Sequence, residues 1–439
     1  MGSNEDDKRS IQIGLIGMGE MGKLYATKLS QDGWHVNACD RPENYEALQN
    51  STIGQLPNVT VMANGHLVSR TSDFIIYSVE AEIIDKIVAL YGTSTKVGAI
   101  VGGQTSCKAP EVAAFEKHLP RDVHIIPIHS LHGPTVDTRG QPLVLIQHRA
   151  SDEKMRLVER ILSCFNSQYV YLTAEQHDKI TADTQAATHA AFLSMGEAWA
   201  ANNQFPWQVS RYAGGIENVK INVALRIYSN KWHVYAGLAI LNPAAKAQIR
   251  QYAKSVTELM KLMVEQREEE FKDRVYNAGK FVFGKLFQAG GKEVLLRDDV
   301  LDQYSLSTVP KEERTPNNQL SLLAMVDCWF QLGLVPYNHM VCSTPIFRMW
   351  LGITEYVYTQ PGFLDECIDT ALHNITFRSD DLEFTFAARS WSDCVMFGNF
   401  EAYRQRFEKI QAYFEPRFEE AKVVNNEMLR RLATLIPKR

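Results

Sequence analysis

A glycine-rich turn between a strand and a helix constrains the fold of this chain more than any other feature. The segment "IQIGLIGMGEMG" carries Gly17, Gly19 and Gly22 in GxGxxG spacing directly after an apolar run. The first glycine permits a tight turn, the second lets the backbone approach a pyrophosphate, and the third allows close packing of the following helix. The phosphates then lie at the helix N-terminus, which favours negative charge. The motif predicts a dinucleotide-binding βαβ unit at the start of the chain.

The residues that follow the turn fit such a unit. A helical pattern covers residues 21–33, and a second apolar run, "WHVNACD", ends in Asp40. Dinucleotide-binding folds place an acidic residue at about this distance, where it binds the adenosine ribose. The turn residues Met18, Glu20 and Met21 are predicted cofactor contacts as well. The alternative is a glycine-rich turn in a sheet protein that binds no nucleotide.

Two neighbouring residues after the second strand favour different cofactors. The Asp40 carboxylate would bind both ribose hydroxyls of NAD and repel a 2′-phosphate. The Arg41 guanidinium would pair with that phosphate and therefore favours NADP. These two residues alone leave the choice between NAD and NADP open.

The first part of the chain alternates short apolar runs with helical or turn-rich segments. Several runs are apolar throughout, which is typical of strands buried on both faces of a mostly parallel sheet. The further predicted strands are "DFIIYSV", "VGAIVGG", "VHIIPIHS", "PLVLIQH" and "QYVYLT". The predicted fold class is therefore α/β, with an N-terminal Rossmann-type doubly wound sheet over residues 1–173 as the dinucleotide-binding domain.

After the last of these strands, long helical patterns dominate. Residues 177–200 are rich in alanine, and residues 251–275 predict a long helix with an apolar stripe. Residues 290–318 are polar, which predicts a domain boundary or a long surface loop. We therefore expect an all-helical substrate and dimerisation domain over residues 174–314, followed by a C-terminal helical extension over residues 315–439.

The composition excludes several classes of protein. The net charge is −5 and no block of Lys and Arg stands out, so neither nucleic acid nor an anionic membrane is an expected partner. The seven cysteines are scattered without CxxC pairs or Cys/His ligand spacing, which fits reduced thiols in the cytoplasm and predicts no metal site. The N-terminus is polar and acidic, unlike a signal or transit peptide. No apolar stretch reaches the roughly 18 residues of a membrane span.

Two histidines follow the apolar run that begins at Val123. When a carbinol carbon gives hydride to a nicotinamide, its hydroxyl must lose a proton, and histidine is suited to accept that proton near neutral pH. His129 stands at the predicted carboxyl end of the strand, the edge where open α/β sheets bind ligands. It is the candidate base, with a structural histidine as the alternative. His132, next to Gly133 and Pro134, is expected to shape the loop.

The turn "VGGQTSCK" lies at the same predicted edge of the sheet. A strand ends there in two glycines, and the Ser106 hydroxyl follows. Ser106 is therefore a second candidate site residue. Because serine is a favoured helix cap, capping of the next helix is the alternative role.

Together these segments resemble the prephenate dehydrogenase family, most closely its fungal type. The resemblance rests on the glycine turn, "GGQTSCK", "IHSLHG", "HDKITADTQAATHAAF" and "ALRIYSNKWHVYAGL". For the fungal type it covers nearly the whole chain, and for the wider family about the first 290 residues. It implies oxidative decarboxylation of prephenate to 4-hydroxyphenylpyruvate in tyrosine biosynthesis, with NADP as the cofactor and NAD as the alternative. It also implies a cytoplasmic homodimer formed through the helical domain.

The resemblance implies roles for four residues. His129 matches a histidine that hydrogen-bonds the ring hydroxyl and draws off its proton, and Ser106 matches a serine that helps hold this hydroxyl. His189 matches a histidine that orients the substrate, and Arg226 matches an arginine that binds a substrate carboxylate. Prephenate has two carboxylates, so a bidentate arginine contact is expected. A surface or dimer salt bridge is the alternative for Arg226.

The sequence departs from the wider family in two places. The bacterial pattern has HPM or HPI after the first histidine, whereas this chain has "HSLHG", which leaves the loop shape and the role of His132 open. Gln185 and Ala186 stand one turn before His189, where the family usually has a serine or another histidine. Recognition of the substrate side chain is therefore expected to differ in detail.

Two other functions compete with this interpretation. A β-hydroxyacid or 6-phosphogluconate-type dehydrogenase shares the glycine turn, but it needs a lysine with an asparagine one turn on, and the nearest pair here is Lys179 with Asp183. A non-catalytic dinucleotide-binding protein would keep the glycines but has no need of the serine, the histidines and the arginine. Both alternatives can be tested against prephenate dehydrogenase activity.

Overall fold

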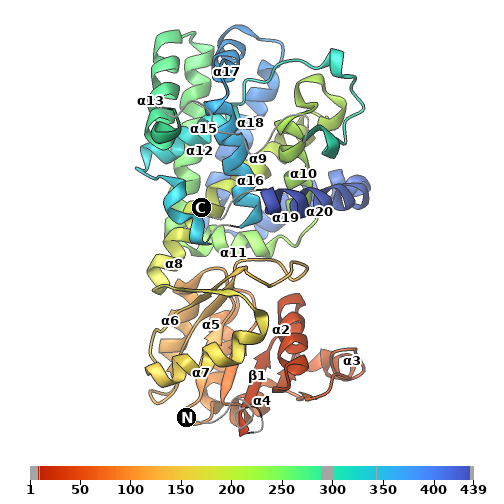
Figure 1. The fold of residues 1–439 in the computed structure, drawn as a ribbon, viewed down its shortest axis with the longest axis vertical. Helices are drawn as coiled ribbons and strands as arrows, with labels where there is room; N and C mark the ends of the chain where they lie inside the picture. Colours follow the sequence, from red (N-terminus) through yellow and green to blue (C-terminus); the bar gives the residue numbers. More distant parts are fainter. Residues whose placement is uncertain (1–7, 9, 288–300, 343, 436–439) are drawn as a thin grey trace. The chain divides into compact units, whose positions relative to one another are not determined.

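The computed structural model describes residue 8 and residues 10–287, 301–342 and 344–435. The chain forms two compact units, residues 1–180 and 181–439. The first unit contains the strands, and the second is built from helices (Figure 1). The polar N-terminus at residues 1–7 and the first part of the polar segment, residues 290–300, lie outside the described residues.

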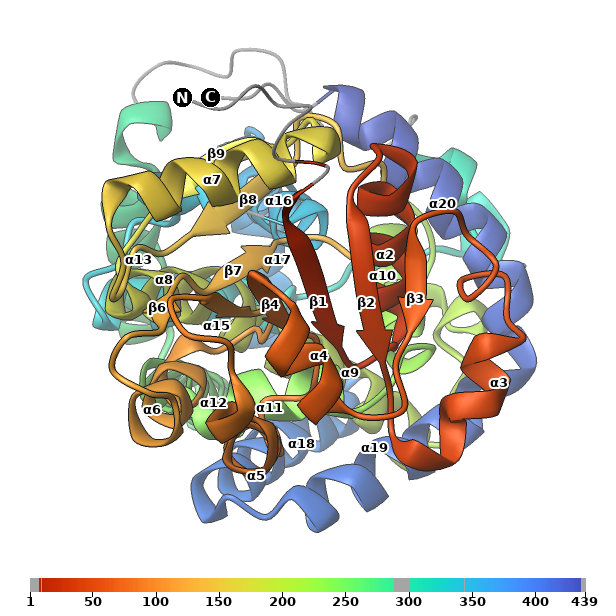
Figure 2. The same ribbon diagram turned by 90° about the horizontal axis from the view of Figure 1, so that it is seen from below.

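A six-stranded parallel sheet forms the centre of the first unit. Its strand order is β3-β2-β1-β4-β5-β6, and strands β3, β2, β1 and β4 run side by side in Figure 2. This order confirms the predicted Rossmann-type sheet. The strands are β1 (Gln12–Ile16), β2 (His35–Cys39), β3 (Val59–Val61), β4 (Phe74–Tyr77), β5 (Ile100–Gly103) and β6 (His124–Ile125).

Helices cover both faces of this sheet because the strands are apolar on both sides. Ile13 and Ile76 pack on one face against helices α2 and α7, and Ile75 and Val101 pack on the other face against α4, α5 and α6. This arrangement is the doubly wound architecture. The helices are α2 (Glu20–Gln31), α3 (Tyr45–Gln49), α4 (Gly65–Thr71), α5 (Ile84–Tyr91), α6 (Lys108–His118), α7 (Asp152–Leu162) and α8 (Ala174–Thr181).

The predicted strand "VHIIPIHS" is two strands in two different sheets. Strand β6 ends at Ile125, and β7 begins at Ile128 in a separate sheet of order β7-β8-β9. Pro127 lies between them and has no N–H for a sheet hydrogen bond, which explains why the pairing changes there. The expectation that His129 ends a strand of the parallel sheet is therefore wrong, because His129 lies within β7. The strands of the second sheet are β7 (Ile128–Ser130), β8 (Pro142–Leu145) and β9 (Gln168–Tyr171).

The second unit is helical throughout its described residues. Buried side chains from both sides of residue 314, among them Tyr252, Trp329 and Trp350, belong to one hydrophobic core. The expected division of this region at residue 314 stays a prediction. The helices are α9 (Ala187–Ala201), α10 (Ile216–Tyr228), α11 (His233–Leu241), α12 (Pro243–Val264), α13 (Glu268–Phe287), α15 (Leu320–Gln331), α16 (Pro345–Thr359), α17 (Phe363–His373), α18 (Arg378–Phe397), α19 (Phe400–Phe414) and α20 (Phe418–Leu435).

Two predicted helices differ in detail from the structure. The helix expected over residues 251–275 breaks between α12 and α13, where Gln266 has a left-handed φ of 53°. The apolar stripe of α12 is nevertheless buried, as predicted. The helix expected over residues 177–200 contains a π-helical turn at Ala182–Ala186. Such turns insert one extra residue and often occur at functional sites.

No helix among the described residues is long and apolar enough to cross a membrane.

Candidate active site

The glycine turn has the geometry that a dinucleotide site requires. Gly17 has a φ of +100°, and a side chain there would meet the carbonyl of Ser78. A side chain at Gly22 would meet the carbonyl of Gly17, so this glycine allows the close approach of α2. At Gly19 a Cβ atom would meet no other atom within 4 Å, so the backbone is open to a ligand. Each glycine thus has the role expected from its position.

The N-terminus of α2 is open to an anion. Gly19 is its N-cap residue and supplies no side chain, so no side chain caps the helix. Glu20 is exposed and forms an ion pair of 3.0 Å with Lys23, while the Met18 side chain is buried in the core. Met18 can therefore contact a cofactor only through its backbone, and Met21 is half-buried beside it. The turn fits the phosphates of a dinucleotide.

Asp40 and Arg41 lie directly after β2, at the carboxyl edge of the parallel sheet. Asp40 Oδ1 accepts a hydrogen bond of 2.8 Å from the backbone N–H of Arg41. The Arg41 side chain is 76% exposed, with Nη1 4.0 Å from Glu43 Oε1. The backbone N–H of Gly17 donates to the carbonyl of Cys39, which joins the end of β2 to the glycine turn. An exposed guanidinium beside the ribose position can reach a 2′-phosphate.

His129 is the end of a chain of three buried side chains. Its Nδ1 lies 2.7 Å from His177 Nε2, and His177 Nδ1 lies 2.8 Å from Asp178 Oδ1. A carboxylate accepts, so His177 donates from Nδ1, and its Nε2 must then accept the N–H at His129 Nδ1. This order leaves a lone pair on His129 Nε2. The arrangement can orient a neutral imidazole as a proton acceptor.

Burial keeps this imidazole neutral. Desolvation, followed by His177 and Lys108, lowers the pKa of His129 well below its ordinary value. Burial also lowers the pKa of His177, although the hydrogen bond to Asp178 opposes this shift. Both rings are therefore uncharged near neutral pH, as the hydrogen-bond order requires.

Asp178 holds this chain to the N-terminus of α6. Its carboxylate accepts backbone N–H bonds of 2.7 Å from Lys108 and 2.8 Å from Ala109. Burial raises the pKa of Asp178, but the hydrogen bonds from His177 and the backbone outweigh this and lower it. Asp178 thus caps α6 and fixes His177 at the same time.

Ser106 precedes α6 on the "VGGQTSCK" turn. The N-cap residue of α6 is Cys107, so the structure gives Ser106 no capping role. The turn is held by a buried ion pair of 2.8 Å between Lys108 and Glu111. Lys108 Nζ also donates to the carbonyl of Ile128 at 2.9 Å. This contact fixes the Ser106 turn to the strand that carries His129.

A second contact joins the strand of His129 to the helix after the glycine turn. The hydroxyls of Tyr25 on α2 and Ser130 on β7 lie 2.8 Å apart. His132 follows on the loop and donates from Nδ1 to the carbonyl of Gly133 at 2.9 Å. This local bond agrees with the predicted loop-shaping role of His132.

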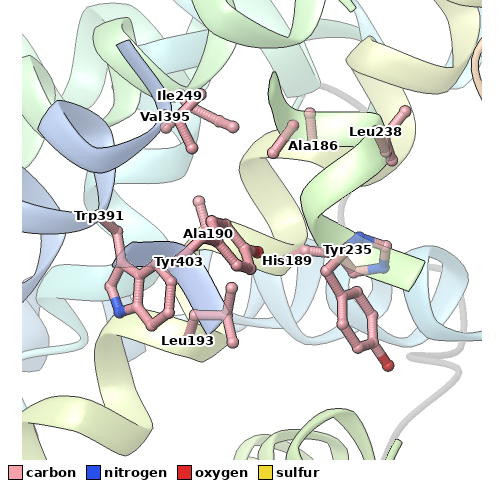
Figure 3. Close-up of a pocket in the computed structure, with 11 residues that line it drawn as sticks. Ala186, His189, Ala190, Leu193, Tyr235, Leu238, Ile249, Trp391, Val395 and Tyr403 are labelled. Atoms are coloured by element: carbon pink, nitrogen blue, oxygen red, sulfur yellow. The ribbon is translucent and has the colours of Figure 1, made fainter. Parts of the chain in front are cut away.

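In the helical unit, His189 lines a largely apolar pocket (Figure 3). Its ring lies edge-on to Tyr235, with ring centres 4.9 Å apart. Burial lowers the pKa of His189 to about 4, and its Nδ1 has no hydrogen-bond partner among the described residues. A neutral histidine with a free ring nitrogen can bind a polar group of a ligand. The other lining residues are Ala186, Ala190, Leu193, Leu238, Ala239, Ile249, Trp391, Val395 and Tyr403.

Arg226 lies in the last turn of α10 and is half-buried. Its Nη1 is 3.5 Å from Asn426 Oδ1, and it forms no ion pair with any described residue. Burial lowers the pKa of Arg226, while nearby Tyr235 opposes the shift. The salt bridge considered as the alternative for Arg226 is therefore absent within the described part of the chain. A half-buried arginine without a carboxylate partner can bind an anionic ligand.

The predicted site residues thus fall into two pairs, one in each unit. Ser106 and His129 belong to joined elements of the first unit, and His189 and Arg226 belong to the second. Each pair is described within its own unit. His177, Asp178 and Tyr235 were not among the predicted site residues, although all three lie in segments quoted for the family resemblance.

The lysine site of the β-hydroxyacid dehydrogenases is not formed. Lys179 is exposed, whereas Asp183 is buried and lies one turn further on. Asp183 accepts a hydrogen bond from Gln248 Nε2 and lies 3.6 Å from His339 Nε2. The two residues therefore face different surroundings and do not form a base and its partner.

Both units match known protein families. A family model described as a 6-phosphogluconate dehydrogenase C-terminal domain, of the type found in tyrosine-biosynthesis enzymes, matches residues 186–434. A model described as NADP oxidoreductase, coenzyme F420-dependent, matches residues 12–101. These two matches cover the helical unit and the glycine-turn half of the parallel sheet.

Two curated fungal proteins are similar over nearly their whole length. A probable NADP-dependent prephenate dehydrogenase of Schizosaccharomyces pombe is 59% identical over 431 residues, which are 98% of this chain and 100% of the relative. The NADP-dependent prephenate dehydrogenase of Saccharomyces cerevisiae is 54% identical over 434 residues, 97% of this chain and 95% of the relative. A solved prephenate dehydrogenase structure from Aquifex aeolicus is 18% identical, with a TM-score of 0.47, and covers 61% of this chain and 95% of that one.

Proposed function

The chain belongs to the prephenate dehydrogenase family, and we propose that it converts prephenate to 4-hydroxyphenylpyruvate and CO2 with reduction of NADP. The observation within the structure that best supports this chemistry is the buried chain His129–His177–Asp178. It orients a neutral imidazole whose Nε2 lone pair can accept a hydrogen bond from the ring hydroxyl of the substrate.

The reaction needs little more acid–base chemistry than this one group. As the hydroxyl-bearing ring carbon loses hydride, the hydroxyl proton moves toward His129 Nε2. The carboxylate on the opposite ring carbon leaves as CO2, and its electron pair makes the ring aromatic. The proton then returns to the oxygen of the phenol product. His129 therefore polarises the hydroxyl and ends the cycle neutral, which suits a histidine with a lowered pKa.

Ser106 acts beside His129 in this proposal. Its turn is fixed to the strand of His129 through Lys108, which supports a joint grip on one hydroxyl. His189 orients the substrate with its free ring nitrogen, and Arg226 binds one of the two carboxylates. A half-buried guanidinium without a carboxylate partner of its own supports this role.

The cofactor accepts the hydride, and the residues of the first unit fit NADP. The open backbone at Gly19 and the uncapped N-terminus of α2 suit the pyrophosphate. Arg41 is exposed and suits the 2′-phosphate, while Asp40 suits the remaining ribose hydroxyl. The two fungal relatives named for NADP support the same choice.

A spectrophotometric assay of the purified protein tests the proposal. We expect prephenate-dependent formation of reduced nicotinamide, with NADP preferred over NAD. Cofactor binding without turnover of prephenate would instead favour a non-catalytic dinucleotide-binding protein. Turnover of a β-hydroxyacid but not of prephenate would favour the other dehydrogenase class.

Three further expectations complete the proposal. The protein is a homodimer formed through the helical unit, it is cytoplasmic, and its helical part divides at about residue 314. Sedimentation of the purified protein tests the first expectation, and fractionation of cells tests the second. Limited proteolysis tests the third, since a true boundary gives cleavage near residue 314 before either side is degraded.

A further inference from the structure

The helical unit contains a second pocket, here called the polar pocket, which has no role in the proposed reaction. It lies between one end of α9, the start of α10, the start of α18 and the segment before α15. It holds about 390 Å³ of empty space, including the part open to solvent. The lining residues are Met195, Ala198, Trp199, Arg211, Tyr212, Glu217, Lys220, Asn317, Asn318, Gln319, Leu320, Ser321, Asp380, Asp381 and Phe384.

The charges of the polar pocket are buried and nearly all paired. Arg211 is 3% exposed and donates to Asp381 at 2.9 Å, with Asp380 3.7 Å away. Lys220 pairs with Glu217 at 2.9 Å. The lining carries two cationic and three anionic side chains, so one negative charge is in excess. Such a concentration of buried charge is costly unless it is compensated.

Two acceptor oxygens in this lining have no partner. Glu217 Oε1 accepts from Lys220, Asn317 and Gln319, but Glu217 Oε2 has no hydrogen bond to any described residue. The Oε1 atom of Gln319 is likewise without a partner in the described chain. Glu217 and Gln319 are only 5% and 3% exposed. Arg211 has an unpartnered Nε, but both of its terminal nitrogens are already bonded.

The backbone at this position is also unusual. Gln319 has a φ of 55°, in the left-handed region that a glutamine rarely adopts. Its side-chain nitrogen donates to Glu217 at 2.7 Å, so the strained residue holds the carboxylate in place. Strain of this kind persists where the surrounding structure enforces it and often marks a binding site.

The rest of the lining is apolar or aromatic, with Trp199 and Phe384 among the side chains. A ligand for this pocket must supply hydrogen-bond donors and a positive charge to Glu217 and Gln319, and an apolar body to the aromatic walls. A primary ammonium has three donors and no acceptor, and aromatic faces attract it. We propose that the polar pocket binds a small primary amine, with its ammonium group on Glu217 Oε2 and Gln319 Oε1.

Calorimetric titration of the purified full-length protein with 2-phenylethylamine tests this proposal. The expected result is saturable binding of the amine and no comparable binding of 2-phenylethanol, which has the same body without the charge. No saturable binding of the amine would overturn the proposal, and so would equal binding of the alcohol. Neither outcome depends on catalytic activity.

A substitution separates the polar pocket from other sites for the amine. Glu217→Gln should weaken binding at least about tenfold, because a charge-assisted hydrogen bond is lost. The matched control is Glu258→Gln, since Glu258 also pairs with a lysine three residues on, Lys261, but lies outside the pocket. Equal binding to Glu217→Gln and the control would overturn the proposal.

A second variant covers the case in which Glu217→Gln fails to fold. Gln319→Asn keeps an amide that tolerates a positive φ but withdraws it by one methylene group. The expected result is weaker binding of the amine with an unchanged circular dichroism spectrum. Unchanged affinity in this variant would count against the proposed position of the ammonium group.

Discussion

The contact between His177 and His129 gives the sharpest prediction for catalysis. Replacing His177 by alanine removes the acceptor at 2.7 Å that keeps the proton on His129 Nδ1. A buried hydrogen bond that orients a group contributes about 1.5–3 kcal/mol when a charge develops on it. Since about 1.4 kcal/mol corresponds to a factor of ten, kcat should fall about 10- to 150-fold.

The pH profile separates this role from a purely structural one. Burial, then His177, lowers the pKa of wild-type His129, so the neutral base persists well below pH 6.5. Protonation inactivates it, and activity is therefore lost as the pH falls through the pKa of the folded state. Without His177 one contribution that lowers this pKa disappears and water can enter. The acidic limb of the kcat profile should then move to higher pH.

Steady-state kinetics across a pH series, with saturating NADP and prephenate, measures both effects. The matched control is His148→Ala, because His148 also pairs with a neighbouring side chain, Glu116, but is far more exposed. Its kcat and its pH profile should match those of the wild type. A His177→Ala enzyme with wild-type kcat and an unmoved acidic limb would refute the orienting role of His177.

Other residues give independent tests. His129→Ala should lower kcat by orders of magnitude while fluorescence titration shows nearly unchanged NADP affinity. Arg226→Ala should mainly raise the KM for prephenate, and unchanged kinetics would contradict its role as a carboxylate ligand. Arg41→Ala should weaken NADP binding about tenfold or more and leave NAD binding nearly unchanged. His189 has its pKa lowered to about 4 by burial, so below pH 6.5 the unfolded chain binds more protons than the folded one, and stability decreases as the pH falls. At pH 5 this costs about 2 kcal/mol relative to neutral pH, and urea unfolding of His189→Leu should show a shallower pH dependence.

The parallel sheet could be predicted because its evidence is local. Gly17, Gly19 and Gly22 each have a steric reason to be glycine, and the strands on either side are continuous apolar runs. Pro127 could have divided "VHIIPIHS" in advance, since a proline cannot donate in a sheet. The apolar residues on both sides of it concealed this break. The apolar pattern therefore predicted the correct sheet but the wrong place for His129.

The candidate site was only partly predictable because its contacts are distant in sequence. His177 is 48 positions from His129, and Asp178 caps a helix that begins 70 positions earlier. No spacing rule relates such residues, because the fold alone decides which helix end meets which strand. The π-helical turn before His189 also depends on tertiary packing, and no residue in "ADTQA" requires it.

The break at Pro127 has a consequence for redesign of the enzyme. The residues expected to choose between NAD and NADP, Asp40 and Arg41, follow a strand of the parallel sheet, whereas His129 belongs to the second sheet. Within the described chain, neither Asp40 nor Arg41 bonds to His129 or His177. Coenzyme preference and proton handling are thus separate modules. An engineer can exchange the first without disturbing the second.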